Sequence, residues 1–350
     1  MSNVIKNNCG GCLRRHYFYI FLIHRETWLP SNRLLRSHTI VSATKYCFDE
    51  ADSDKIVRST STVHVTKQFG ESGHEDYEPS NCRPVGKSFE RPPTADLGHL
   101  GRLPTELLLE ITEILDIDSL FNLRQVNLRS RSLVTSLPRY QLMVLHGLDA
   151  FRTLLLTRLA TQVSLRDFET AMCAKQCHFC GQFGEYVFVF TWKRCCAKCL
   201  MTSPETQVRT QASIRKQFHT TQAELRQITS FKSLPGLYYG DSAFLSRRLT
   251  LLSLHEAESV FERKPLTIRY RTISTKVLNS MGARPLPFYN KKTKQVEHVF
   301  KCLGCQRAYN YGAHPEMEQH AKKIYLREEL LDHFRWCGDA QKIWRLKHGA

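Results

Sequence analysis

The chain has 350 residues, a formal net charge of +17, and 42% hydrophobic and 24% charged residues. This composition is typical of a globular protein and excludes a chain that is disordered throughout, while the length allows two or three domains. The positive charge attracts any polyanion, so it does not by itself choose between nucleic acid, an acidic protein and a membrane surface.

The first 98 residues contain little that could build a core. The apolar run YFYIFLI at 17–23 is too short to span a bilayer and lacks a small-residue cleavage site. We therefore expect no secretory signal and no membrane segment, and an intracellular protein of the cytoplasm or nucleus. Residues 31–98 are rich in small and polar residues and show no sustained helical or strand period. The sequence thus predicts a disordered arm or linker over 1–98.

Three short helices are predicted between 103 and 137. Pro104 suits a first helical turn, and apolar residues then recur at helical spacing from Leu107 onward. Asp118 is the expected N-cap of the second helix and Asn127 that of the third. Each helix is too short to bury its own apolar stripe, so the segment needs a partner protein or a following domain.

The remaining elements are mainly helical. A long helix is expected over 140–160, further helices over 205–232 and 248–261, and a closing helical pair over 315–344. The β-branched and aromatic run EYVFVFTW at 185–192 predicts a strand or hairpin. The predicted fold class is therefore mainly α, with one small hairpin.

The cysteines indicate two metal sites, because clustered Cys-x2-Cys pairs present thiolates to one tetrahedral ion. The first site has the spacing Cys-x2-Cys-x15-Cys-x2-Cys and the ligands Cys177, Cys180, Cys196 and Cys199. Cys195 adjoins Cys196 and is an alternative ligand, although the x2 spacing favours Cys196. Cys173 and Cys195 are then expected to be free thiols.

A second site is predicted from Cys302, Cys305, His333 and Cys337. His333 and Cys337 are four residues apart, which places them on one helix face. His320 competes with His333 but has no paired ligand at helical spacing. Both sites have four protein ligands and no vacancy for water or substrate, so we predict two structural zinc ions and no catalytic metal.

The segment LPTELLLEITEILDIDSLFNLRQVN at 103–127 resembles an F-box in its Leu-Pro start, its Glu-Leu-Leu and the Asp-Ser-Leu of its second helix. The resemblance implies a three-helix module that docks on the adaptor subunit of SCF-type cullin–RING ubiquitin ligases. The contact residues that it implies are Leu103, Pro104, Leu107, Leu108, Ile111, Leu120 and Leu123. Ser130 stands where many members of the family have a tryptophan. The C-terminal string with CLGCQRAY and LLDHFRWC is similar to that of fungal F-box proteins with Cys-rich C-terminal regions.

The cysteine pattern fits two alternative interpretations less well. A RING domain interleaves eight ligands in a compact segment, whereas about a hundred residues separate Cys199 from Cys302. A nucleic-acid-binding finger of the common type needs a His-x3–5-His pair that neither site has. A ribbon-like first site beside the basic TWKRCCAKC keeps a zinc-stabilised nucleic-acid-binding protein open as the alternative function.

The resemblance to an F-box therefore implies a non-catalytic subunit that holds a target protein at a ubiquitin ligase. The predicted organisation is an arm (1–98), an F-box (99–140), a helix with a ribbon-like site of four cysteines (141–232) and a helical region with a site of three cysteines and one histidine (233–350). The expected partners are the adaptor, through it a cullin, and a target protein that the sequence does not identify.

Overall fold

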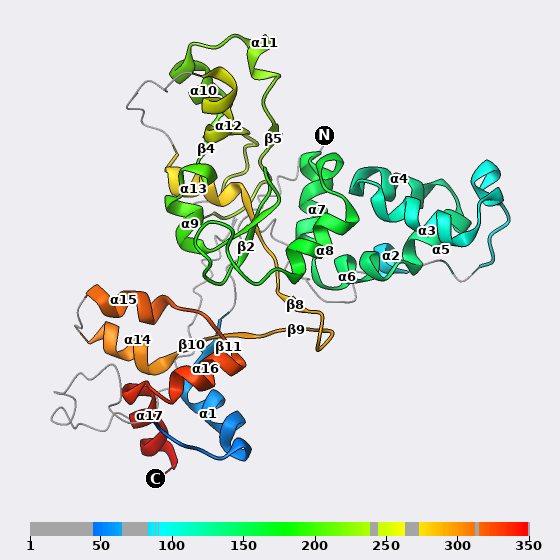
Figure 1. Cartoon of the computed structure of the whole chain (residues 1–350). Coiled ribbons are helices and arrows are strands. Elements are labelled where there is room, and N and C mark those ends of the chain that lie inside the picture. The colour runs from blue at the N-terminus through cyan, green and yellow to red at the C-terminus, as the bar shows by residue number, and fades with distance from the viewer. Residues whose placement is uncertain are drawn as a thin grey trace, which may run out of the picture. The chain divides into compact units, whose positions relative to one another are not determined.

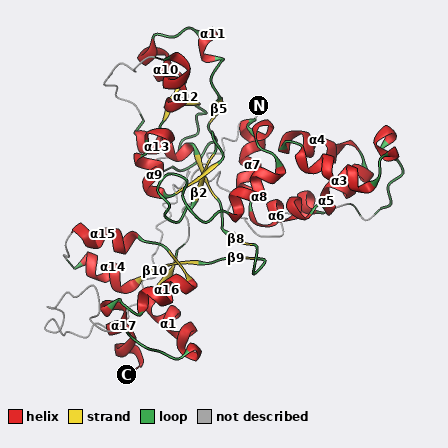
Figure 2. Cartoon of the chain, viewed as in Figure 1, coloured by secondary structure: helices red, strands yellow, loops and turns green. Residues whose placement is uncertain are grey.

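The computed structural model describes residues 45–64, 83–87, 89, 91–238, 244–262, 273–311 and 315–348. Helices dominate these residues, and the strands between them are only two to four residues long (Figure 1). The predicted mainly α class is confirmed, as the prevalence of helix in Figure 2 shows. Within the described part of the chain, no helix is long and apolar enough to cross a membrane.

A run of helices occupies residues 105–173. Its members are α3 (Thr105–Ile114), α4 (Ile117–Val126), α5 (Leu128–Ser136), α6 (Pro138–His146), α7 (Leu148–Thr157) and α8 (Leu165–Cys173). The three predicted short helices are α3, α4 and α5. Asn127 caps α5 as predicted, because its side chain accepts the Ser130 N–H at 2.8 Å. The predicted cap of α4 is wrong by two residues: Asp116 accepts the Ser119 N–H at 2.9 Å, and Asp118 lies inside the helix.

The single long helix predicted over 140–160 is wrong, because the chain breaks at Gly147 between α6 and α7. A β-carbon on Gly147 would lie 2.6 Å from a ring carbon of Phe168 in α8. The break thus allows the chain at Gly147 to lie against Phe168, next to the contact between α6 and α8. Tyr140, Phe151 and Phe168 are buried together with them in one hydrophobic core.

Gly147→Ala is expected to destabilise the protein by about 1–3 kcal/mol, because an added β-carbon overpacks the contact with Phe168. Urea unfolding of the purified chain measures the change. Ser132→Ala is the matched control, since Ser132 is exposed in the middle of α5. An unchanged unfolding midpoint for Gly147→Ala would contradict the packing described at this position.

Among the described residues, the strands form three three-stranded sheets and one two-stranded ribbon, all antiparallel. The sheet orders are β1-β10-β11, β3-β2-β7 and β4-β6-β5, and β8 pairs with β9. The strands are β1 (Ser61–Val63), β2 (Tyr186–Phe188), β3 (Lys193–Cys195), β4 (Val208–Thr210), β5 (Ser230–Lys232), β6 (Thr250–Ser253), β7 (Ala283–Pro285), β8 (Tyr289–Asn290), β9 (Gln295–Val296), β10 (Val299–Cys302) and β11 (Tyr325–Leu326). The predicted hairpin is confirmed as β2 and β3, and β7 adds a third strand from about a hundred residues later.

The remaining helices follow the predicted segments less closely. They are α1 (Ser53–Thr60), α2 (Arg83–Gly86), α9 (Ala197–Thr202), α10 (Gln211–Phe218), α11 (Gln222–Leu225), α12 (Leu254–Phe261), α13 (Thr275–Met281), α14 (Leu303–Asn310), α15 (Pro315–Lys322), α16 (Arg327–Phe334) and α17 (Gly338–His348). Segments 205–232 and 248–261 are helical only in part, since β4, β5 and β6 occupy their ends. The closing helical pair predicted over 315–344 is instead three helices, α15, α16 and α17, with β11 between α15 and α16.

The disordered arm predicted over 1–98 is wrong for residues 45–64. Ile56 and Val57 of α1 are buried in a core with α16 and α17, and β1 pairs with β10. This short helix and strand gain stability from partners more than two hundred residues away, so no local period announces them. Residues 1–44, including the apolar run at 17–23, and residues 65–82 lie outside the described residues.

Three hydrophobic clusters organise the described residues. One joins α4–α9, α13 and the β3-β2-β7 sheet, a second joins α1, α14, α16 and α17, and a third lies among α10, α11, α12 and β6. The first cluster contains most of the first cysteine group, and the second contains most of the other group. Each predicted metal site is therefore part of a core.

Candidate docking surface and metal centres

An exposed apolar face runs along α3. Leu107, Ile111 and Ile114 follow one another at helical spacing and are 46%, 39% and 66% exposed. Pro104 precedes the helix and is exposed as well, whereas Leu103 is half-buried. These side chains form a stripe of aliphatic groups at the surface of the molecule, of the kind that helix-in-groove recognition uses.

The predicted contact residues do not all lie on this face. Leu108 is 8% exposed and Leu120 only 1%, so both face the interior, and Leu123 packs half-buried against the same core. In this conformation these three leucines pack inside the domain, and Leu107 and Ile111 are the predicted contacts of α3 that remain exposed. Ile114 belongs to the exposed face although it was not among the predicted contacts. The helical period contained this signal, since Ile114 is seven residues after Leu107.

Arg139 of α6 holds the face in position from behind. It forms ion pairs with Glu113 of α3 and with Glu169 of α8, the latter at 2.6 Å. Lys291 adds a second cation to Glu169 at 3.2 Å. Burial alone would raise the pKa of the Glu169 carboxyl, but Arg139 and Lys291 outweigh it and lower this pKa. The network links the exposed helix to the core behind it.

The comparison with known families decides the nature of this segment. A family model of the F-box domain matches residues 100–142. Residues 100–142 are an F-box domain. No similar curated protein and no similar solved structure was found for the chain. F-box domains are the modules that bind the adaptor subunit of SCF-type ubiquitin ligases, and the proteins that carry them act generally as non-catalytic substrate receptors.

The first cysteine group lies next to the hairpin that follows α8. The ligand atoms of Cys177, Cys180, Cys196 and Cys199 all lie within 4.8 Å of one another, so the group could hold a metal ion. The first pair sits on a tight turn in which Gly181 donates its N–H to the Cys177 carbonyl and has a φ of 72°. The second pair opens α9, with Cys196 at the N-cap. A left-handed φ of this kind suits glycine, which has no β-carbon.

The neighbouring thiols differ from these four. Cys195 is buried in β3 and is not part of the group, and burial raises the pKa of its thiol. Within the group, a hydrogen bond from the Cys196 thiol lowers the pKa of Cys177 to about 4, so one thiolate is already favoured there. Thiolates are the form that binds a metal. The structure therefore brings Cys196 rather than Cys195 to the predicted site.

The second group combines residues from β10, α14, α16 and the turn before α17. Cys302, Cys305, His333 and Cys337 also lie with their ligand atoms within 4.8 Å of one another. His333 Nε2 is 3.3 Å from Cys305 Sγ, and Cys337 Sγ is 3.8 Å from the same sulfur. His320, the competing residue, lies on α15 outside the group.

Two contacts that sequence reasoning missed support the second group. Tyr325 stacks on the His333 ring at a centroid distance of 4.7 Å, and its hydroxyl lies 3.3 Å from His333 Nδ1. Nε2 is thereby directed at the cysteines. Gly304 allows α14 to pass close to α17, because a β-carbon there would lie 2.4 Å from the Ala340 nitrogen. Tyr325 lies on a separate strand, so no spacing in the sequence connected it with His333.

Arg194 is a third missed residue, and it braces the first group. It is 3% exposed and donates hydrogen bonds to the carbonyls of Ala171, Gly184, Leu286 and Pro287. Burial lowers the pKa of its guanidinium to about 10. Its bonds connect the cysteine hairpin to α8 and to the segment after β7. In the sequence, Arg194 is only a basic residue beside Cys195, and arginine is more typical of a protein surface than of a core.

Proposed function

We infer that this protein is a substrate-receptor subunit of an SCF-type cullin–RING ubiquitin ligase. The observation that carries the inference is the F-box domain whose first helix presents Leu107, Ile111 and Ile114 to solvent. Because F-box domains bind the adaptor subunit, this face is the proposed contact, with Leu103 and Pro104 at its edge. The chain's effect is then proximity: it raises the local concentration of target lysines beside the ubiquitin carrier. This role belongs to the cytoplasm or nucleus.

We further infer that both cysteine groups bind zinc and that the two ions are structural. Four thiolates, or three thiolates and an imidazole, are the usual ligands of structural zinc, and each full set leaves no open position. The ligands come from loops and element ends that an ion would hold together. Zinc would therefore contribute to folding of the region that we propose binds the target.

The test of the receptor role is affinity capture of the full chain from cells, followed by identification of the bound proteins. The role predicts the adaptor and a cullin in the captured material. The alternative, a zinc-stabilised nucleic-acid-binding protein, predicts salt-sensitive DNA or RNA binding without the adaptor. That second result would replace the proposal.

Tyr325→Phe is expected to weaken zinc binding by the second group about tenfold, because partners of a metal-binding histidine orient its ring. The phenyl ring keeps the stacking on His333 and removes only the hydroxyl. Competition with a chromogenic chelator measures the affinity. Tyr309→Phe, which changes an exposed tyrosine of α14, is the control. Equal affinity of Tyr325→Phe and wild type would show that the hydroxyl does not position His333.

A further inference from the structure

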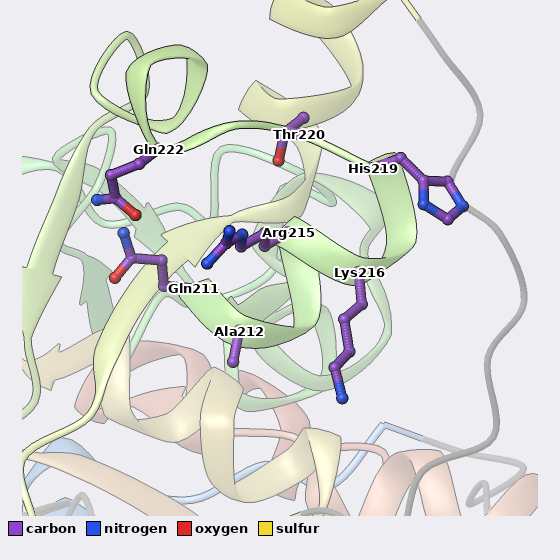
Figure 3. A pocket seen from close by; sticks show the side chains of 7 residues that line it. All are labelled: Gln211, Ala212, Arg215, Lys216, His219, Thr220 and Gln222. Carbon is purple, nitrogen blue, oxygen red and sulfur yellow. The ribbon is translucent and has the colours of Figure 1, made fainter.

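A polar hollow lies beside α10 and α11, apart from the F-box and from both cysteine groups. Its volume is about 720 Å³ (Figure 3). The polar residues that line it are Gln211, Arg215, Lys216, His219, Thr220 and Gln222. None of these described lining residues is acidic. The hollow therefore offers hydrogen-bond donors and positive charge without a carboxylate of its own.

The strongest indication of a ligand in the hollow is the buried hydroxyl of Thr220. The residue is only 5% exposed, and its Oγ1 has no hydrogen-bond partner among the described residues, although its backbone N–H bonds to the Arg215 carbonyl at 3.2 Å. A buried hydroxyl without a partner costs about 1–3 kcal/mol. In Figure 3 the hydroxyl oxygen lies on the side that faces Arg215 and α10. An acceptor atom bound in the hollow would satisfy it.

Arg215 supplies the charge for such an acceptor. Its side chain is exposed and forms no ion pair with the described residues. In Figure 3 the Arg215, Gln211 and Gln222 side chains extend toward one side of the hollow, while His219 points away from them. A guanidinium presents two parallel N–H groups to an oxyanion, and the two carboxamides add further donors.

The two basic residues at the end of α10 would not indicate a ligand by themselves. Arg215 and Lys216 lie in the last turn of the helix, where the helix dipole favours cations in any protein. The dipole does not explain an unpartnered buried hydroxyl or the two carboxamides that line the same hollow. These features together fit a ligand that accepts several hydrogen bonds and carries negative charge.

We propose that this hollow binds an oxyanion, a carboxylate or a phosphate, carried by a side chain of the target protein. Arg215 binds the charge, Gln211 and Gln222 donate from their carboxamides, and the Thr220 hydroxyl donates to the buried side of the anion. The identification of the carrier as a target protein rests on the proposed receptor function. The anion site itself rests only on the residues of the hollow.

The test is fluorescence anisotropy with the full chain and three labelled peptides that differ at one position, which is phosphoserine, glutamate or serine. We expect an anionic peptide to bind more tightly than the serine peptide. Arg215→Glu is expected to weaken its binding at least about tenfold, because hydrogen bonds to charged groups are among the strong ones. Arg226→Glu reverses an exposed arginine outside the hollow and is the matched control, with binding expected within about twofold of wild type.

The outcomes distinguish a phosphate from a carboxylate, and they also show whether the proposal is wrong. Tighter binding of the phosphoserine peptide than of the glutamate peptide identifies the anion as a phosphate. Equal binding of these two peptides shows that a carboxylate is sufficient. Thr220→Val, which keeps the shape and removes the hydroxyl, is expected to lose part of that affinity. The proposal is overturned if the serine peptide binds equally well, if Arg226→Glu weakens binding as much as Arg215→Glu, or if a single-stranded oligonucleotide binds more tightly than every peptide.

The same variants distinguish this proposal from the receptor function. Arg215→Glu changes a residue outside residues 100–142, so it should capture the adaptor as wild type does. Peptide binding without adaptor capture would refute the receptor role and keep the anion site. Adaptor capture without tighter binding of the anionic peptides would support the receptor role and refute the anion site.

Discussion

The double variant Leu107→Asp/Ile111→Asp is expected to lose capture of the SCF adaptor. Both side chains are exposed in the free chain and belong to the aliphatic face of α3. Burial of one such side chain at an interface stabilises it by about 1.5–3 kcal/mol, and a carboxylate placed there adds an unpaired charge. The pair of changes should therefore weaken adaptor binding by at least about a hundredfold. Pull-down with purified adaptor measures the loss.

The control for this variant is Leu156→Asp/Leu346→Asp, which places two aspartates at exposed leucines of α7 and α17 outside the F-box domain. It should bind the adaptor like wild type. Both double variants should keep the wild-type unfolding midpoint, because they change exposed positions. Undiminished capture by Leu107→Asp/Ile111→Asp would show that the adaptor binds a different face of the F-box.

Leu108 and Leu120 need a different interpretation in such experiments. Both are buried, so their replacement by aspartate would lower the stability of the domain before any contact with the adaptor is considered. Loss of adaptor binding in those variants would not locate the interface. The structure thus separates residues that can report on docking from residues that report on folding.

Cys305→Ser is expected to lower the zinc content from about two ions per chain to about one. Cys305 lies at the centre of the second group, 3.3 Å from His333 Nε2, and serine is a poor zinc ligand at neutral pH. Because the group lies in the core that joins α1, α14, α16 and α17, loss of the ion should also expose this region to proteolysis. Elemental analysis and limited proteolysis measure the two effects.

Cys47→Ser is the control, since Cys47 is an exposed thiol outside both groups. It should keep both ions. A strong chelator should remove zinc from wild type and reproduce the proteolysis of the second region. If the purified wild-type chain contains no zinc, both proposed sites are refuted. If Cys305→Ser still contains two zinc ions per chain, the proposed ligands of the second group are refuted.

Zinc binding is also expected to weaken as the pH falls. Metal binding needs deprotonated thiols, so protons compete with the ion for the sulfur atoms and displace it when the pH is low enough. In the metal-free first group the pKa of Cys177 is already lowered to about 4 by its hydrogen bond from Cys196. This thiolate therefore persists to lower pH than an ordinary thiol does.

Local patterns in the sequence predicted the F-box and the two cysteine groups. The Leu-Pro start and helical period predicted the F-box, and the family match confirmed it. The Cys-x2-Cys spacings and the four-residue step from His333 to Cys337 predicted two groups, and the structure brings the same eight residues together as two. Such patterns are reliable because residues two to four apart have their relative positions set by one turn of backbone.

Tertiary structure decided everything that depends on distant partners. It selected His333 over His320 and Cys196 over Cys195, and it placed Leu108 and Leu120 inside while leaving Leu107 and Ile111 outside. It also turned residues 45–64 from a predicted arm into part of a core, through pairing with β10 and packing against Phe334. Periodicity reports that one side of an element is apolar, but which neighbour covers that side depends on contacts between residues hundreds of positions apart. The sequence alone therefore determined the F-box and the members of the two cysteine groups, and only the fold decided which of their side chains meet solvent or core.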